Sequence, residues 1–183
     1  VSVMGNNKRY KSIGGKIIFG KSDPNNINYD HLVFASRNIT NCNIPPYIKH
    51  IDSFSFKECQ NLQSIIFPEN SQLLSIGRDS FSMSFIVSIS IPDSITQIRK
   101  CTFALCKQLQ TVTFSKSSKL EKIEESAFCY TSIEEITIPP HVKTIEMLAF
   151  SNCCKLRSFQ FSEGSEISQI ETSTFSDSSI EEL

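Results

Sequence analysis

Ile-Pro-Pro-His-Val-Lys-Thr-Ile-Glu-Met-Leu-Ala-Phe-Ser-Asn-Cys-Cys-Lys-Leu, residues 138–156, is the stretch that decides the fold, because most of its apolar residues recur 47 positions earlier. The recurring sets are Ile44/Ile91/Ile138, Phe56/Phe103/Phe150, Cys59/Cys106/Cys153, Leu62/Leu109/Leu156, Phe67/Phe114/Phe161, Ile76/Ile123/Ile170 and Phe81/Phe128/Phe175. A fixed period with fixed apolar anchors is typical of a solenoid, in which each unit packs on its neighbours.

Each of these units contains two unequal halves. One anchor series alternates between a shorter and a longer step, 23 and 24 in turn, through Ile44, Phe67, Ile91, Phe114, Ile138 and Phe161. Repeats of about 20–29 residues fall in the range of leucine-rich repeats. We therefore expect the anchors to point inward in stacked coils, with Phe56, Phe103 and Phe150 in a single interior column.

Short extended segments alternate with turns inside each unit. Ile136 and Ile138 have the two-residue period of a strand, and Pro139 should end its ladder because proline has no N–H to donate. A second extended stretch is expected at 142–145. Residues 147–153 are too few for a full helix, so they predict one 3₁₀ or α turn that carries Phe150 inward.

The N-terminal part of the chain follows the repeat less closely. Phe34, Ile39 and Cys42 lie one full period before Phe81, Ile86 and Ile89. We therefore expect repeats over residues 26–183 and a hairpin-like cap or a degenerate repeat over residues 1–25. Residues 180–183 fall where a further strand should begin, so the repeats are expected to be truncated there.

Composition excludes several classes of function. The net charge is −1 with no basic stripe, which argues against a nucleic-acid partner. No apolar run approaches the roughly 18 residues that a membrane span requires. The chain starts with valine and shows no signal peptide, so we expect it to be a segment of a longer protein.

The seven cysteines favour structural thiols over a disulfide framework. Cys59, Cys106 and Cys153 occupy one repeat position, where stacking should place them side by side in the interior. The odd total would leave at least one free thiol unless pairing is intermolecular. The sequence has no Cys-x-x-Cys, and its three histidines lack metal-ligand spacing, so neither a metal nor a cofactor is expected.

The sequence carries no motif of an enzyme. It lacks Gly-x-Ser-x-Gly, and its six glycines form no phosphate-binding loop. A nucleophile pair of Cys129 and His141 stays open on sequence grounds, without any supporting motif. We expect a non-enzymatic protein.

The pattern Ile-Pro-x-x-Val-x-x-Ile-x-x-x-Ala-Phe-x-x-Cys-x-x-Leu at residues 138–156 resembles the BspA-like class of leucine-rich repeat. That class occurs in surface proteins of host-associated bacteria and in large families of mucosal protists. The match covers about residues 26–183. The chain departs from the pattern where isoleucine and phenylalanine replace most leucines, and where the alanine is replaced by Ser55, Ser80, Thr102 and Thr174.

The resemblance implies a curved, right-handed leucine-rich repeat solenoid. A parallel β-sheet would line its concave face, with short strands, turns and 3₁₀ segments on the convex side. It also implies adhesion or binding of a host protein, which does not follow from the fold itself.

Residues that alternate with the inward anchors should point outward on the concave face. They are Asn41, Asn43, Ser64, Ile66, Ser88, Ser90, Thr111, Thr113, Glu135, Thr137, Ser158 and Gln160. This set is mostly small, hydroxyl-rich and uncharged, with Glu135 the only charge. It predicts a flat binding strip for an extended protein or glycan, although serine and threonine are equally compatible with a solvated strand face.

Two surface features have alternative interpretations. Asn38-Ile39-Thr40 is an N-glycosylation sequon, so Asn38 would carry a glycan if it is exposed in a secreted protein. Acidic residues at 121–135 lie near Lys116, Lys119 and Lys122. They indicate either an interaction patch or, more simply, a solvated face of mixed charge.

These observations predict a fragment of a cell-surface or secreted adhesin that binds a host protein or glycan, with extracellular-matrix components among the candidates. The alternative is an intracellular, cytoplasmic scaffold for a protein partner, which buried reduced thiols would suit. End-to-end self-association is a third expectation, because stacked coils leave strand edges open.

Overall fold

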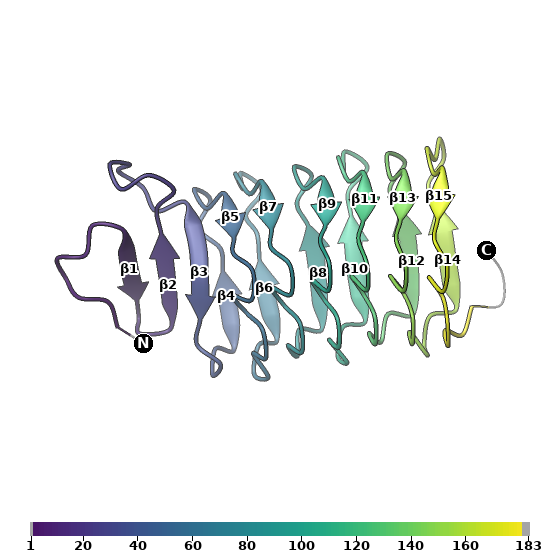
Figure 1. Ribbon diagram of the computed structural model, residues 1–183, viewed down its shortest axis with the longest axis horizontal. Helices are drawn as coiled ribbons and strands as arrows, with labels where there is room; N and C mark the ends of the chain where they lie inside the picture. The colour runs from purple at the N-terminus through teal and green to yellow at the C-terminus, as the bar shows by residue number, and fades with distance from the viewer. Residues whose placement is uncertain (1, 181–183) are drawn as a thin grey trace.

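The computed structural model describes residues 2–180 as a β-solenoid whose coils stack along one long axis (Figure 1). All regular elements in this range are strands, β1 to β15, and no helix occurs among them. Residues 181–183, within the segment where the sequence predicts a further strand, lie outside the described residues. The repeats therefore form the expected solenoid of leucine-rich repeat type.

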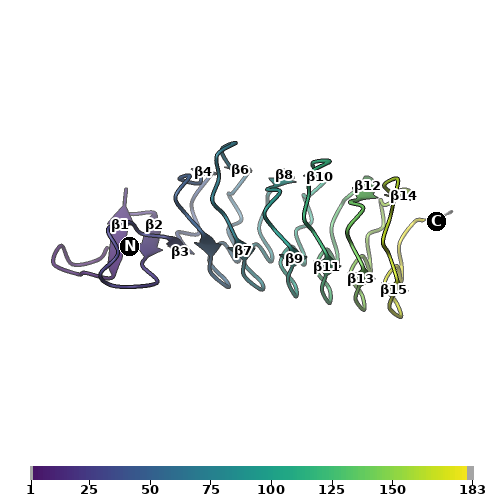
Figure 2. The same cartoon turned by 90° about the horizontal axis from the view of Figure 1, so that it is seen from above.

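One side of the solenoid carries the longer strands. These are β4 (Asn41–Asn43), β6 (Ser64–Ile66), β8 (Ser88–Ile91), β10 (Thr111–Phe114), β12 (Glu135–Ile138) and β14 (Ser158–Phe161). They form three parallel two-stranded ladders, β4–β6, β8–β10 and β12–β14. Figure 2 shows this side, called here the long-strand face, opposite the side of the short strands.

The opposite side carries two-residue strands. These are β5 (His50–Ile51), β7 (Ser75–Ile76), β9 (Gln97–Ile98), β11 (Lys122–Ile123), β13 (Thr144–Ile145) and β15 (Gln169–Ile170). The last four form one parallel sheet, while β5 and β7 continue a sheet that starts at the N-terminal end. Each isoleucine of these strands pairs with the isoleucine of the neighbouring coil, and all but Ile170 are buried.

A column of phenylalanine rings runs through the interior, as the period predicts. Phe56, Phe81, Phe103, Phe128 and Phe150 are fully buried, and consecutive rings stack with centroids 5.0–5.4 Å apart. Phe175 continues the column at 6.0 Å from Phe150. The two halves of each repeat unit thus contribute one ring each to the same column.

The segments around these rings are not helical turns, so the prediction of a 3₁₀ or α turn at 147–153 is wrong. The residues two before and two after each ring have left-handed backbones, as at Leu148 (φ 61°) and Asn152 (φ 58°). These residues interrupt the right-handed helical path. The freed N–H groups bond to the next coil instead, as when Phe128 N donates to Ala149 O at 2.9 Å.

The N-terminal end is an antiparallel arrangement. Strands β1 (Tyr10–Ile13) and β2 (Ile17–Gly20) form a hairpin, and β2 pairs antiparallel with β3 (His31–Ala35). Strand β3 then pairs in parallel with β5 and so joins the hairpin to the coils. We propose that residues 1–25 act as a cap on the repeats of residues 26–183.

The repeat is displaced by one position in this first coil. Phe34, expected as an inward anchor, is only half-buried and lies against the Arg37 guanidinium, 5.0 Å from its ring centroid. Ala35 takes the column position instead, since it is fully buried and its N–H donates to Ser55 O. The spacing between Ala35 and Phe56 is therefore one residue shorter than the spacing between Phe81 and Phe103, the equivalent positions one period later.

The buried cysteines are interleaved with hydroxyl side chains, and this corrects the expected side-by-side thiols. Cys106 Sγ lies 3.5 Å from Ser84 Oγ, and Cys153 Sγ lies 3.3 Å from Thr131 Oγ1. Cysteines one period apart are two coils apart, because each unit makes two coils. The repeat position that cysteine occupies in one coil is therefore occupied by serine or threonine in the next coil.

Candidate functional site

The long-strand face presents outward the twelve residues that the sequence assigns to it. Ten of the twelve are exposed, and Ser64 and Ser158 are half-buried. The residues between them, such as Ile89, Val112 and Ile136, are buried. This alternation follows from the two-residue period of a strand that has one face on the core.

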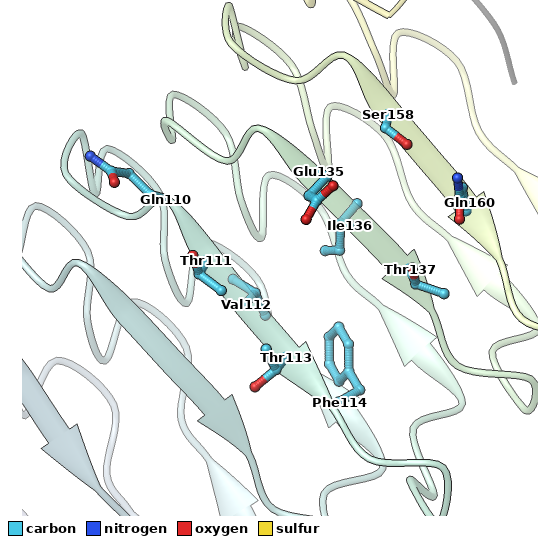
Figure 3. A pocket seen from close by; sticks show the side chains of 10 residues that line it. All are labelled: Gln110, Thr111, Val112, Thr113, Phe114, Glu135, Ile136, Thr137, Ser158 and Gln160. Atoms are coloured by element: carbon cyan, nitrogen blue, oxygen red, sulfur yellow. The ribbon is translucent and has the colours of Figure 1, made fainter.

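The face is not the flat, continuous strip that the sequence predicts. Strands separated by the shorter step of the repeat are hydrogen-bonded, as in β8–β10, whereas strands separated by the longer step, such as β10 and β12, share no ladder. Between β10 and β12 this break opens into a cleft of about 320 Å³. Figure 3 shows the side chains around it.

The cleft has an apolar floor and a polar rim. Val112 and Ile136 face it from the core side and are almost fully buried. Phe114, which is half-buried, stands between the ends of β10 and β12 (Figure 3). The rim is formed by seven polar residues, Gln110, Thr111, Thr113, Glu135, Thr137, Ser158 and Gln160.

Four lining residues were not predicted as site residues, namely Gln110, Val112, Phe114 and Ile136. The sequence analysis treats Phe67, Phe114 and Phe161 as inward anchors equivalent to isoleucines. In the structure Ile44, Ile91 and Ile138 are buried in the core. Phe67, Phe114 and Phe161 are half-buried and pack against the edge of the core. The strict alternation of Ile and Phe at this position is the signal that could have separated them.

Several side chains on the cleft rim have no polar partner among the described residues. Within residues 2–180, the side chains of Thr111, Thr113, Glu135, Thr137 and Gln160 make no hydrogen bond or ion pair with the protein. Glu135 is the only charged residue among those that line the cleft. By contrast, Ser64 Oγ donates to Asn41 Oδ1 at 2.7 Å on β4–β6.

Charged groups gather on the opposite side and pair between coils. Lys122 Nζ lies 2.6 Å from Glu146 Oε1, and Lys100 Nζ lies 2.6 Å from Glu125 Oε2. Burial raises the pKa of Glu146, but the Lys122 hydrogen bond and other contacts outweigh it and hold that pKa below its usual value. These pairs fit the simpler interpretation of the charged cluster, a solvated face of mixed charge.

All seven cysteines are free, and the buried ones have little nucleophilic character. Burial raises the pKa of Cys42 and of Cys106 to about 12 and that of Cys153 to about 11. A thiol with such a pKa stays neutral near pH 7 and is inert. Cys154 is the one exposed cysteine, and all seven lie within the described residues.

The open Cys129–His141 pair is not assembled as a catalytic site. His141 Nδ1 lies 2.8 Å from Glu166 Oε1 on the exposed surface, and burial raises the pKa of the Cys129 thiol. No hydrogen bond joins the two side chains in the described part of the chain. Residues 2–180 also contain no cluster of three or more His, Cys, Asp or Glu side chains that could hold a metal ion.

Asn38 is exposed in the turn before β4, and Ser36 Oγ lies 2.5 Å from its Oδ1. This position leaves room for a glycan, so modification of Asn38 in a secreted protein stays a proposal. In the described range there is no helix with the length and apolar character needed to cross a bilayer.

Solved structures of similar fold include several bacterial proteins. Over the whole chain, a leucine-rich repeat protein from Eubacterium ventriosum is 20% identical with a TM-score of 0.76, and the chain covers 53% of it. A leucine-rich repeat protein from Bacteroides ovatus is 24% identical over 88% of the chain and 47% of its own length, with a TM-score of 0.69.

A third similar structure is a leucine rich cell surface protein from Faecalibacterium prausnitzii. It is 20% identical over 86% of the chain and 55% of its own length, with a TM-score of 0.51. The chain thus spans about half the length of these proteins. No curated protein matches the chain at a significant level.

The sequence profile of the BspA type leucine rich repeat region matches residues 28–153 and 121–183, with six copies. These matches cover all of the parallel coils and their interior column. The chain therefore belongs to the BspA-type leucine-rich repeat family.

Proposed function

We propose that this chain is a non-enzymatic recognition module of a cell-surface or secreted protein, an adhesin fragment that binds a host protein or glycan through its long-strand face. The observation that carries the proposal is the character of that face. Its outward residues are uncharged apart from Glu135, and those around the cleft have no partners within the described protein. Such groups can bond to a ligand without first breaking internal bonds.

Two further observations support this proposal. Repeat solenoids bind partners along extended surfaces made of many small contacts, which suits a face of short, regularly spaced strands. One protein of similar fold is described as a leucine rich cell surface protein. Matrix proteins and glycans of the host surface are therefore the first ligands to screen.

The test adds positive charge at the centre of the long-strand face. Thr113→Lys and Thr137→Lys each place a lysine on an exposed strand position beside the cleft. A ligand bound there should lose at least about tenfold in affinity, near 1.4 kcal/mol, because the lysine must be desolvated in the complex. Surface plasmon resonance against immobilised matrix proteins and glycans measures the effect.

Gln97→Lys is the matched control, because Gln97 is an exposed strand residue on the opposite side. It should bind like the unchanged protein, and all three variants should keep the same circular dichroism spectrum. If all variants bind the ligand with equal affinity, the binding site does not lie on the long-strand face.

An intracellular scaffold is the second candidate, and the seven free thiols favour it. Disulfides are rare in reducing compartments, so a chain rich in free cysteine suits the cytoplasm. Mass spectrometry of the protein from its native host discriminates the two, since a glycan on Asn38 requires passage through a secretory pathway. End-to-end self-association stays a further proposal, which sedimentation velocity at several concentrations tests.

A further inference from the structure

The cleft between β10 and β12 is a small hollow in the long-strand face. Its volume of about 320 Å³ lies at the lower end of the range for small-molecule sites. A second cavity of about 490 Å³ shares Phe114 and Thr137 with it and continues past the strand ends to Pro139 and Pro140. The two together form one groove that follows the gap between the strands.

The groove is too narrow for an inserted peptide strand. Cα atoms of β10 and β12 come within 8 Å of one another. A strand that bonded to both would need them roughly 10 Å apart, twice the usual spacing between neighbouring strands. Strand addition is therefore excluded without a separation of the two coils, which the continuous sheet from β9 to β15 on the other side resists.

The lining combines an aromatic ring with groups that both donate and accept hydrogen bonds. Phe114 offers an apolar surface between the strands, and Thr111, Thr113 and Thr137 carry hydroxyls on the rim. Gln160 adds an amide and Glu135 a carboxylate. A hydroxyl or amide can serve either role, so such a rim matches a ligand whose own polar groups are hydroxyls.

A sugar ring likewise combines apolar C–H groups on its faces with polar hydroxyls around its edge. Its C–H groups carry a small positive charge and pack on the negative face of an aromatic ring, while its hydroxyls bond at the periphery. Among the residues that line the cleft itself, the single charge is the carboxylate of Glu135, whereas Lys116 and Glu163 line the continuation of the groove past the strand ends. A sulfated, sialylated or uronic-acid sugar would bring a second negative charge against Glu135 and is disfavoured in the cleft.

We infer that the cleft between β10 and β12 binds an uncharged sugar residue of a glycan, with Phe114 as the stacking surface and Thr113, Glu135 and Thr137 as hydrogen-bonding partners. The inference rests on the proposed function, because it names a ligand class for the long-strand face. The groove that continues to Pro139 and Pro140 accommodates the next sugar of a linear chain.

The second cavity, which lies past the strand ends, has an equivalent one unit earlier. There Phe67 and Ser90 line a cavity of about 500 Å³ together with Pro92, and its lining also includes the charged residues Glu69, Asp93 and Lys119. Two such positions, one full period apart in sequence, suit a ligand that itself repeats. This favours a polysaccharide over an isolated monosaccharide.

The experiment is isothermal titration calorimetry of the whole chain with neutral hexasaccharides. Cellohexaose, maltohexaose, mannohexaose and chitohexaose are the probes, and a hyaluronan hexasaccharide is the acidic comparator. At least one neutral probe should bind more tightly than hyaluronan. Phe114→Leu, which keeps an apolar side chain but removes the ring, should weaken that binding about tenfold.

Phe161→Leu is the matched control, because Phe161 occupies the same repeat position but does not line the cleft. It should bind within twofold of the unchanged protein. If Phe114→Leu does not fold, Thr113→Trp fills the cleft from an exposed strand position and should abolish binding. Methyl resonances of Thr113 and Thr137 should shift when the sugar is added.

Three outcomes would overturn the inference: no neutral probe binds or moves those methyl resonances, hyaluronan binds best, or Phe114→Leu and Thr113→Trp bind normally. A protein ligand that moves the same resonances while sugars do not would assign the cleft to a protein. If no sugar binds but Thr113→Lys and Thr137→Lys still weaken the binding of a matrix protein, the proposed recognition function is supported. Only the assignment of the cleft to a sugar is then rejected.

Discussion

Ser80 and Thr102 occupy the same place in adjacent coils, immediately before a buried phenylalanine. Both are buried, yet Thr102 Oγ1 donates to Arg99 O at 2.8 Å whereas Ser80 Oγ has no hydrogen-bond partner among residues 2–180. Two other coils have Ala127 and Ala149 at this position. A buried hydroxyl without a partner is destabilising, whereas a bonded one is mildly favourable.

Ser80→Ala is therefore expected to raise the free energy of unfolding by about 1 kcal/mol, and Thr102→Val to lower it by a similar amount. Urea denaturation followed by circular dichroism measures both. The two variants are controls for each other, because they alter one hydroxyl at equivalent positions. A loss of stability in Ser80→Ala would mean that its hydroxyl is bonded in solution.

Phe103 lies at the middle of the ring column, fully buried between Phe81 and Phe128. Phe103→Ala should lower the free energy of unfolding by about 3–5 kcal/mol, because the stacked coils cannot collapse into the space left by one ring. Phe85→Ala is the control, since that ring is 41% exposed, and it should cost less than about 1 kcal/mol. Equal costs in the two variants would contradict the interior column.

At the scale of elements, the ladders between coils differ on the two sides of the solenoid. The long strands pair only across the shorter step of the repeat, while the short strands β9 to β15 pair at every step. From β9 to β15 one side of the solenoid is therefore a continuous sheet, with β5 and β7 in a separate sheet, and the other side is a row of strand pairs. The cleft is a consequence of this difference rather than of any single residue.

Gly77 lies where two coils approach each other closely. A Cβ at this position would lie 2.4 Å from Ser53 N and 2.8 Å from Ser53 Cα. Gly77→Ala should therefore cost about 1–3 kcal/mol of unfolding free energy, since backbone atoms must move to admit the methyl group. Thermal unfolding measures the loss.

Gly5→Ala serves as the comparison for this glycine, because no atom of the described residues lies within 4 Å of its added Cβ. Its stability should stay within about 0.5 kcal/mol of the unchanged protein. An unchanged melting temperature for Gly77→Ala would show that the two coils separate there in solution.

At the scale of the whole molecule, the period allows a unit to be removed. Deletion of residues 91–137 joins Ser90 to Ile138, which restores the sequence position of Ile91. The shortened chain should fold with the same parallel ladders and a lower free energy of unfolding, because stability in a solenoid is roughly a sum over units and their interfaces. The urea m-value should fall with the buried surface.

Deletion of residues 91–126 is the out-of-register control. It joins Ser90 to Ala127 and displaces every later anchor, so this chain should not form the ladders. Far-ultraviolet circular dichroism and a denaturant titration compare the two deletions. If both deletions fold equally well, or both fail, the full period is not the unit of stability.

The sequence by itself determined the features that depend on a residue and its local period. The repeat fixed the ring column of Phe56, Phe103 and Phe150, and two-residue alternation fixed the outward direction of Thr113 and Thr137. Both follow from which side chains must leave water, and periodicity reports that directly.

Only the tertiary structure decided how one coil meets the next. The left-handed turns around each ring, the interleaving of Cys106 with Ser84 and the cleft beside Phe114 all depend on contacts between segments of successive coils. Whether two neighbouring strands bond or leave a gap is set by the spacing of whole coils. That spacing is a property of the assembled stack: the alternating step lengths of the repeat accompany it, but only the packed coils show which step leaves a gap.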